Sequence, residues 1–279
     1  MSINQVVNLQ TVGYTIFKYD DQTIENRVHA EGIVLATNTI FRNIVEAVYG
    51  VWGSNVVAEK MIYSKKGFIA EKSQLQGIIS INNVYLTDTT ASTVHSIQGR
   101  ITWNNIEKKT PCQSIVAMQK VELHNVLCTG RAGSWNDQVI AKESSLHYVF
   151  AKTMIELIDT TAETVTSEFG GLIATNCNLA KVEAYRNVTF TNTNCHSLLV
   201  VVKDRNNTIT LTENSSVRGD LVIKMIHMSF ISDTNTFKLI IIGKHLIQGS
   251  IIFSDCCKIS EKSTSEGAVE IIGITQQYG

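Results

Sequence analysis

Apolar and polar residues alternate along many short stretches of the chain, a pattern typical of half-buried β-strands. Its most regular form is an apolar residue, any residue, glycine, any residue and then alternating apolar residues. Four segments have this form: Leu75–Ile81, Ile97–Trp103, Val217–Ile223 and Ile247–Phe253. Looser copies surround Gly32 and Gly171. A short motif that returns this often predicts a protein built from repeated strands.

The spacing of the motif glycines predicts how long one repeat is. These glycines are Gly32, Gly77, Gly99, Gly171, Gly219 and Gly249, and successive sequence numbers differ by 45, 22, 72, 48 and 30. Most differences are close to multiples of about 22–24, a period that suits one coil of a parallel β-solenoid. The glycines are expected at bends, where the chain turns without a Cβ clash. The sequence therefore predicts an all-β, single-domain parallel β-solenoid over residues 1–279, with about twelve coils.

Other all-β folds also produce many short strands. A β-propeller repeats about every 40–45 residues, which fits the gap from Gly32 to Gly77 but not the gap from Gly77 to Gly99. A β-sandwich or jelly roll gives short strands with irregular spacing, and it stays the alternative fold.

Two segments, residues 39–52 and 145–158, carry apolar residues three and four positions apart, as a helix would. Both also alternate like strands, so both interpretations stay open. The open end of a solenoid exposes unpaired backbone groups. Residues 1–28, and also 39–52, are therefore expected to cap the N-terminal end.

Composition and charge narrow the functional classes. Hydrophobic residues make up 44% of the chain, enough for a sizeable core, which argues against disorder. The 24 Lys and Arg against 25 Asp and Glu give a net charge of −1, so nucleic acid is not an expected partner. The single proline agrees with internal strands that donate hydrogen bonds on both sides.

The cysteines indicate a reducing compartment. None of the six has CxxC spacing: Cys112, Cys128, Cys177, Cys195, Cys256 and Cys257. Free buried thiols are favoured over a disulfide framework, and a zinc site is not expected. The N-terminus has no signal-peptide pattern, and no apolar run is long enough to span a bilayer. We expect a cytoplasmic protein without a transmembrane segment.

A search for catalytic motifs assigns no catalytic residue, metal or cofactor. The sequence holds no phosphate-binding loop, no GxGxxG, no GxSxG elbow and no HExxH. The seven histidines are scattered singly, and no carboxylate-rich block occurs.

One stretch, Cys128–Asp137, is predicted to be a surface loop that carries recognition. It contains two glycines, and its candidate binding residues are Arg131, Trp135 and Asp137. The alternative is a long turn whose tryptophan folds back over the core. The segment Thr189–Cys195, rich in Asn and Thr, is typical of turns that stack their side-chain amides into ladders.

At Val217–Ile223 and Ile247–Phe253 the chain resembles right-handed parallel β-helix proteins. More loosely it resembles bactofilin-type polymer-forming proteins, whose coils carry a similar apolar-x-Gly-x-apolar motif. The resemblance implies stacked parallel coils and, for bactofilins, self-assembly. The chain departs from bactofilins in its longer, uneven period and in lacking their disordered tails. Pectate-lyase-like enzymes share the architecture, but the chain lacks their acidic calcium clusters, so no catalytic residue carries over.

These observations favour a non-catalytic structural or interaction module that binds a macromolecule along a flat sheet face or assembles with itself. The partner, protein or carbohydrate, is not identified by the sequence. The alternative is a polysaccharide-degrading or polysaccharide-modifying enzyme with carboxylates gathered on one external face. A third hypothesis is a bacterial effector delivered to another cell without a Sec signal.

Overall fold

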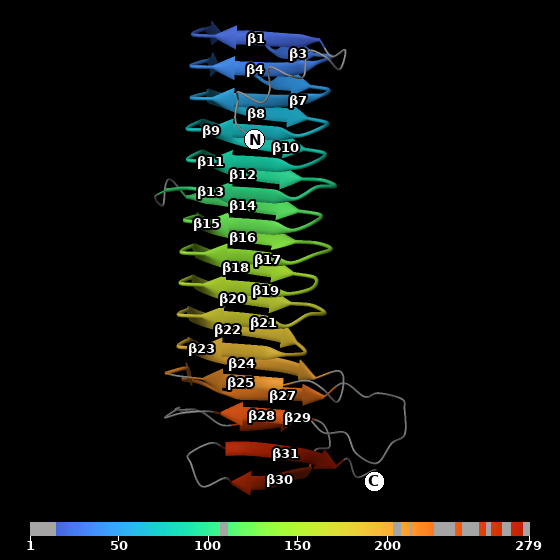
Figure 1. Ribbon diagram of the computed structural model, residues 1–279, viewed down its shortest axis with the longest axis vertical. Coiled ribbons are helices and arrows are strands. Elements are labelled where there is room, and N and C mark those ends of the chain that lie inside the picture. The colour runs from blue at the N-terminus through green and yellow to red at the C-terminus, as the bar shows by residue number, and fades with distance from the viewer. Residues whose placement is uncertain are drawn as a thin grey trace. The chain divides into compact units, whose positions relative to one another are not determined.

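The structure, a computed structural model, describes residues 15–106, 111–202, 208–212, 214–225, 238–241, 251–254, 258–263 and 269–275. The described residues form β-strands and turns, with no helix among them. The chain divides into two compact units, Met1–Trp135 and Asn136–Gly279. Within each unit the strands are layered coil upon coil in two sheets (Figure 1).

In the first unit, sheet A is a parallel ladder in which each strand pairs with its successor in the series. Its strands are β1 (Ile16–Asp20), β4 (Ile33–Thr37), β7 (Gly50–Ser54), β9 (Phe68–Glu71), β11 (Val84–Thr87), β13 (Ile101–Asn104) and β15 (Val121–His124).

Sheet B of the first unit is also a parallel ladder. Its strands are β2 (Thr23–Ile24), β5 (Ile40–Phe41), β8 (Val57–Ser64), β10 (Gln74–Ser80), β12 (Thr90–Ser96), β14 (Cys112–Ala117) and β16 (Leu127–Ser134). The short strands β3 (Val28–Ala30) and β6 (Val45–Ala47) extend it, because β3 pairs with β6 and β6 with β8.

In the second unit, sheet C is parallel at first and antiparallel at its end. Its parallel strands are β17 (Val139–Lys142), β19 (Ile155–Ile158), β21 (Leu172–Thr175), β23 (Val188–Thr191), β25 (Thr208–Thr212) and β28 (Lys238–Ile241). Strand β31 (Val269–Thr275) then pairs antiparallel with β28 and with β30 (Lys258–Ser263).

Sheet D of the second unit is parallel throughout its described strands. They are β18 (Ser145–Ala151), β20 (Thr161–Ser167), β22 (Asn178–Tyr185), β24 (Asn194–Val202), β27 (Leu221–Met225) and β29 (Ile251–Ser254), with β26 (Ser216–Val217) beside β24.

The parallel pairing confirms the predicted solenoid, but the predicted period is wrong. Val51 pairs with Phe68 and Phe68 pairs with Val84, so equivalent positions differ by 17 and then by 16. Side-chain hydrogen bonds between neighbouring coils span the same separations. Longer connections stretch the coil at a few places, as between Ile101 and Val121. The antiparallel neighbours of a sandwich or jelly roll occur only where β31 meets β28 and β30, among the described strands.

The spacing of the motif glycines does not measure the coil length, because these glycines occupy different positions in the coil. Gly77 lies inside β10 of sheet B, whereas Gly99 lies in the turn before β13 of sheet A. The gap between them thus joins two different positions. Gly249 lies outside the described residues. At Gly77 a Cβ would lie 2.4 Å from the Met61 Sδ, so this glycine makes room for a neighbouring side chain rather than forming a bend.

The helical interpretation of residues 39–52 and 145–158 is wrong, and the strand interpretation is confirmed. The first segment forms β5, β6 and the start of β7; the second forms β18 and β19. Strand β5 pairs with β2 on one side and β8 on the other, so residues 39–52 lie between coils and do not cover an end. Of the expected cap at residues 1–28, residues 1–14 lie outside the described part. Within it, β1 and β2 are the first described strands of their ladders and pair with β4 and β5, and the capping role stays a prediction.

The core of each unit lies between its sheets, where alternate side chains of the strands with described burial point inward. Its largest fully buried side chains are Phe41, Phe68, Phe190, Ile62, Ile78, Leu86, Ile101, Ile115, Ile155, Leu157 and Leu172. Four cysteines, Cys112, Cys128, Cys177 and Cys195, are free and buried, as predicted. Cys256 and Cys257 lie outside the described residues.

One turn recurs from coil to coil and holds the polar ladder predicted for Thr189–Cys195. A residue in the left-handed region, such as Asn192 with φ 47°, precedes an inward hydroxyl such as Thr193. The Asn192 amide donates to the Asn176 Oδ1 at 2.9 Å, and Asn176 donates to Asp159 at 3.0 Å. The buried Thr193 hydroxyl donates to the Thr191 carbonyl at 3.0 Å and accepts the Cys177 N–H at 3.2 Å. Backbone groups at the corner are thus satisfied inside the core.

Candidate functional site

The outer face of sheet B in the first unit carries side chains in straight columns. Buried residues alternate with outward-facing ones along much of this sheet, as Val28, His29 and Ala30 do in β3. Since neighbouring strands are in register, the exposed residues of successive coils line up. The central column consists of His29, Glu46, Tyr63, Ile79, His95 and Val116, in that order.

A second column, the edge column, follows the ends of the same strands. Backbone hydrogen bonds from each of its residues to the previous coil fix the order. It consists of Val48, Lys65, Ile81, Ile97, Met118 and Trp135. Ile97 is 50% exposed and Trp135 is 51% exposed, although both are large and apolar. Four consecutive apolar residues of the edge column, Ile81, Ile97, Met118 and Trp135, therefore face solvent, and we call them the apolar strip.

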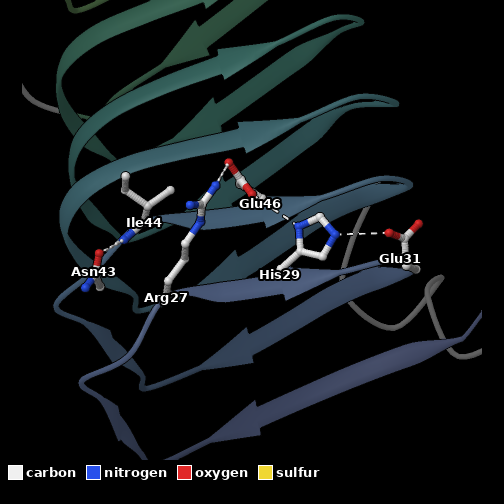
Figure 2. Close-up of polar contacts among 6 residues, drawn as sticks. All are labelled: Arg27, His29, Glu31, Asn43, Ile44 and Glu46. Atoms are coloured by element: carbon white, nitrogen blue, oxygen red, sulfur yellow. Dashed lines mark hydrogen bonds and ion pairs between the residues drawn. The ribbon is translucent and has the colours of Figure 1, made fainter.

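Charged side chains gather at one end of the central column, and we call them the charged cluster: Arg27, His29, Glu31 and Glu46. Figure 2 shows the imidazole of His29 between the two carboxylates. Its Nδ1 lies 3.1 Å from the Glu46 Oε2, and its Nε2 lies 3.0 Å from the Glu31 Oε1. Arg27 donates from Nη2 to the other carboxylate oxygen of Glu46. Each ring nitrogen of a protonated His29 thus has a carboxylate acceptor.

These contacts shift the pKa values of two residues in the cluster. Hydrogen bonds to Glu31 and then Glu46 raise the pKa of His29, because both stabilise its protonated form. Hydrogen bonds from Arg27 and then His29 lower the pKa of Glu46, because both stabilise its ionised form. The cluster therefore combines groups of both signs of charge.

An open cleft of about 400 Å³ lies beside the cluster. His29, Glu31 and Glu46 line its charged end, and Tyr63 and Lys65 also border it. Its apolar lining comes from the two columns and from Ala47, which lies between Glu46 and Val48 in the chain: Ala47, Val48, Ile79, Ile81 and Ile97. An apolar centre with charged residues at its margin is the arrangement found in protein interfaces.

The three predicted binding residues do not lie on one long surface loop: Arg131 lies within strand β16, and Trp135 and Asp137 follow it. The prediction of a loop is wrong for Leu127–Ser134, which is strand β16. Gly130 suits this strand because a Cβ there would lie 1.9 Å from the Gln113 carbonyl oxygen. Arg131 pairs in register with Ser114. Trp135 belongs to the edge column, where it is exposed as part of the apolar strip.

Asp137 belongs to the second unit, where its backbone carbonyl accepts the Thr153 N–H at 3.3 Å. The binding role of Arg131, Trp135 and Asp137 stays a prediction.

Sequence reasoning missed the charged cluster. His29 and Glu46 are exactly one coil apart, a separation of 17 positions, but a period of about 22–24 does not align them. The left-handed turn residues Asn38, Asn55, Lys72 and Asp88 recur with the true spacing, since their sequence numbers differ by 17, 17 and 16. That polar signal, instead of the glycines, could have brought His29 and Glu46 together.

The cluster does not converge on a point where a metal could sit, because the two carboxylates approach opposite nitrogens of one ring. Within the described residues, no group of three or more His, Cys, Asp and Glu side chains is arranged to hold a metal ion. The part of the chain that the structure describes also contains no helix capable of spanning a membrane.

In comparisons with known proteins, the chain matches no family model, no curated protein and no solved structure. The strand pairing thus establishes a parallel β-solenoid, whereas the resemblance to bactofilins has no family match behind it.

Proposed function

We propose that this protein is a non-catalytic structural module that self-associates through the outer face of sheet B. The observation that carries the proposal is the exposed apolar strip, in which Ile97 lines the cleft and Trp135 lies farther along the edge column, each about half exposed. Burying such a strip is favourable at roughly 25 cal/mol per Å² of apolar surface. Contiguous exposed apolar surface often marks a protein interaction site.

A second copy of the chain is the occupant to which we commit. The net charge of −1 means that two copies repel each other little at long range. The cleft also carries both signs, with Lys65 near its apolar part and Glu31 and Glu46 at its charged end. In a two-fold dimer the same patch faces itself, so opposite charges on one patch can pair across the axis. Self-assembly is also what the looser resemblance to bactofilin-type proteins implies.

The enzyme alternative receives less support from this site. A glycosidase needs one carboxyl group that stays protonated as a general acid. The pKa of Glu46 is moved in the opposite direction, mainly by Arg27, and Glu31 and Glu46 hydrogen-bond to the same imidazole. The effector hypothesis rests only on the inference that the protein occupies a reducing compartment. A cytoplasmic location remains part of our proposal.

Sedimentation velocity over a range of concentrations tests the proposal on the full chain. We expect the wild type to form a discrete oligomer whose fraction grows with concentration. The Ile97→Glu variant places a charge in the apolar strip and should sediment as a monomer with an unchanged circular dichroism spectrum. The matched control is Ile173→Glu, because Ile173 is a 39% exposed isoleucine on β21 of the second unit. A wild type that stays monomeric, or equal effects of both variants, contradicts the proposal.

A further inference from the structure

Two buried cysteines lie side by side on neighbouring coils of the first unit. Cys112 opens β14, Cys128 lies near the start of β16, and the two are direct partners in the parallel ladder. Parallel neighbours are about 4.8 Å apart, which lies within the Cα separation of about 4.4–6.8 Å that a disulfide spans. Both side chains point into the core, since Cys112 is 0% and Cys128 is 1% exposed.

The two thiols are ladder neighbours and perturb each other's ionisation. The Cys112 thiol donates to the Ser114 carbonyl at 3.4 Å. The interaction with Cys112 lowers the pKa of Cys128, against the opposing effect of burial. The interaction with Cys128, together with burial, raises the pKa of Cys112. The pair is thus polarised, with Cys128 as the sulfur that ionises first and Cys112 as the one that keeps its proton.

Two further buried cysteines show what an unpaired thiol looks like in this fold. Cys195 has Leu179 and Val217 as its ladder partners, so no other thiol lies beside it in the ladder. Burial raises the pKa of Cys195 to about 12, and burial also raises the pKa of Cys177. Cys177 donates to the Thr175 carbonyl in the corner ladder. These two residues are internal controls in the same protein.

We propose that Cys112 and Cys128 form a redox-active pair that a hydroperoxide converts into a disulfide joining two coils. With hydrogen peroxide, the Cys128 thiolate attacks one peroxide oxygen, the O–O bond breaks, and the products are a sulfenic acid and a hydroxide ion. The Cys112 thiol then attacks the Cys128 sulfur, forming the S–S bond and releasing water. The proton that Cys128 gave up and the hydroxide make a second water. Two thiols are oxidised, and one peroxide is reduced to two waters.

The link would fasten one coil to the next, because Cys112 and Cys128 are ladder partners on successive coils. Since both sulfurs are buried, the reaction should be slower than that of an exposed thiol. The proposal is independent of self-association, because the pair points into the core and the apolar strip points out.

The test treats the folded full-length protein with hydrogen peroxide, blocks remaining thiols with an alkylating agent and maps its peptides without reduction. We expect one peptide pair that contains Cys112 and Cys128 and is lighter than its two parts by two hydrogen atoms. Cys177 and Cys195 should be recovered alkylated. The thermal unfolding midpoint should rise on oxidation and fall back when a phosphine reductant is added.

Substitution sharpens this result. In the Cys112→Ala variant, Cys128 should proceed to the sulfenic and sulfinic acids, and the midpoint should no longer rise. The peptide map of the wild type needs no variant, so the test survives if Cys112→Ala fails to fold. The proposal is overturned if Cys112 and Cys128 are recovered unlinked, or if they link only after the protein has been unfolded in urea.

Discussion

At the scale of single residues, the central column places two histidines in opposite environments. His29 lies between two carboxylates, which raise its pKa. His95, in the same column, is half-buried and hydrogen-bonds to the Ser114 hydroxyl at 2.9 Å. Burial and then the charge of Arg131 lower the pKa of His95. The outer face of sheet B therefore holds one histidine with a raised pKa and another with a lowered pKa.

We predict that a proton NMR titration separates these two histidines. The ordinary midpoint is about 6.5; His29 should titrate above it and His95 below it. Replacing Glu31 with Gln should move the His29 midpoint down and leave that of His95 in place. The variants His29→Gln and His95→Gln assign the two signals. Equal midpoints, or the reverse order, would show that the carboxylate contacts of His29 do not persist in solution.

The stability consequence has a definite sign for each residue. The favourable contacts of protonated His29 are fully present below its unfolded pKa and are lost as pH rises through its raised folded pKa. For His95 the folded pKa is depressed, so its share of stability is present above about 6.5 and is lost as pH falls. The two effects act in adjoining pH windows, because His29 loses its contribution above about 6.5 and His95 loses its contribution below it.

The corner ladder shows what the sequence alone could predict about individual residues. The run Thr189–Cys195 indicated stacked amides, and Asn192 does hydrogen-bond to Asn176. What the run could not indicate is which side chains turn inward. Thr193 is fully buried, whereas Thr191 at the end of β23 is half-buried. Direction depends on the left-handed residue between them, whose φ is not visible in composition.

At the scale of elements, the strands were predictable and their period was not. Alternation predicts strands wherever one face is buried. The coil length, however, depends on which residues are equivalent, and the glycines are not. Gly77 accommodates Met61 and Thr93 in the middle of a strand, whereas Gly170 lies under the Thr153 carbonyl in a turn. In this fold glycine occurs where a neighbouring atom leaves no room for a Cβ. Such places fall at different positions of the coil, so glycine does not mark one of them.

This difference between glycines gives a prediction about strands β10 and β16. A Cβ added at Gly130 would lie 1.9 Å from the backbone oxygen of Gln113. Unlike the end of a side chain, this oxygen cannot move to another rotamer to relieve the clash. At Gly77 the nearest atoms are the ends of the Met61 and Thr93 side chains. We expect Gly130→Ala to lower the free energy of unfolding by about 1–3 kcal/mol. Gly77→Ala should change it by less than about 1 kcal/mol.

Urea unfolding followed by circular dichroism measures both variants against the wild type. A Gly77→Ala variant as unstable as Gly130→Ala would mean that Met61 and Thr93 are packed too tightly to move. A harmless Gly130→Ala would mean that β14 and β16 lie farther apart than the ladder indicates.

At the scale of the whole molecule, the sequence predicted the fold class and missed the candidate site. A solenoid follows from recurring strands, few prolines and an apolar core, all of which are properties of the sequence. The charged cluster instead depends on register, because His29, Glu46 and Tyr63 come from three separate coils. An error of several positions in the period moves each of them beside the wrong neighbour. Trp135 was singled out by its residue type, which needs no alignment of coils; it is exposed, and its binding role stays a prediction.

The salt dependence of self-association distinguishes the two parts of this face. Ion pairs in the exposed charged cluster are screened as ionic strength rises, whereas burial of the apolar strip is not. If the strip drives assembly, adding sodium chloride should change the dissociation constant by less than about tenfold, or about 1.4 kcal/mol. Sedimentation equilibrium at low and high salt measures this change. The Arg27→Gln variant, which removes the contact to Glu46 and leaves the strip intact, should associate as the wild type does. Dissociation of the wild type at high salt would assign assembly to the charges instead.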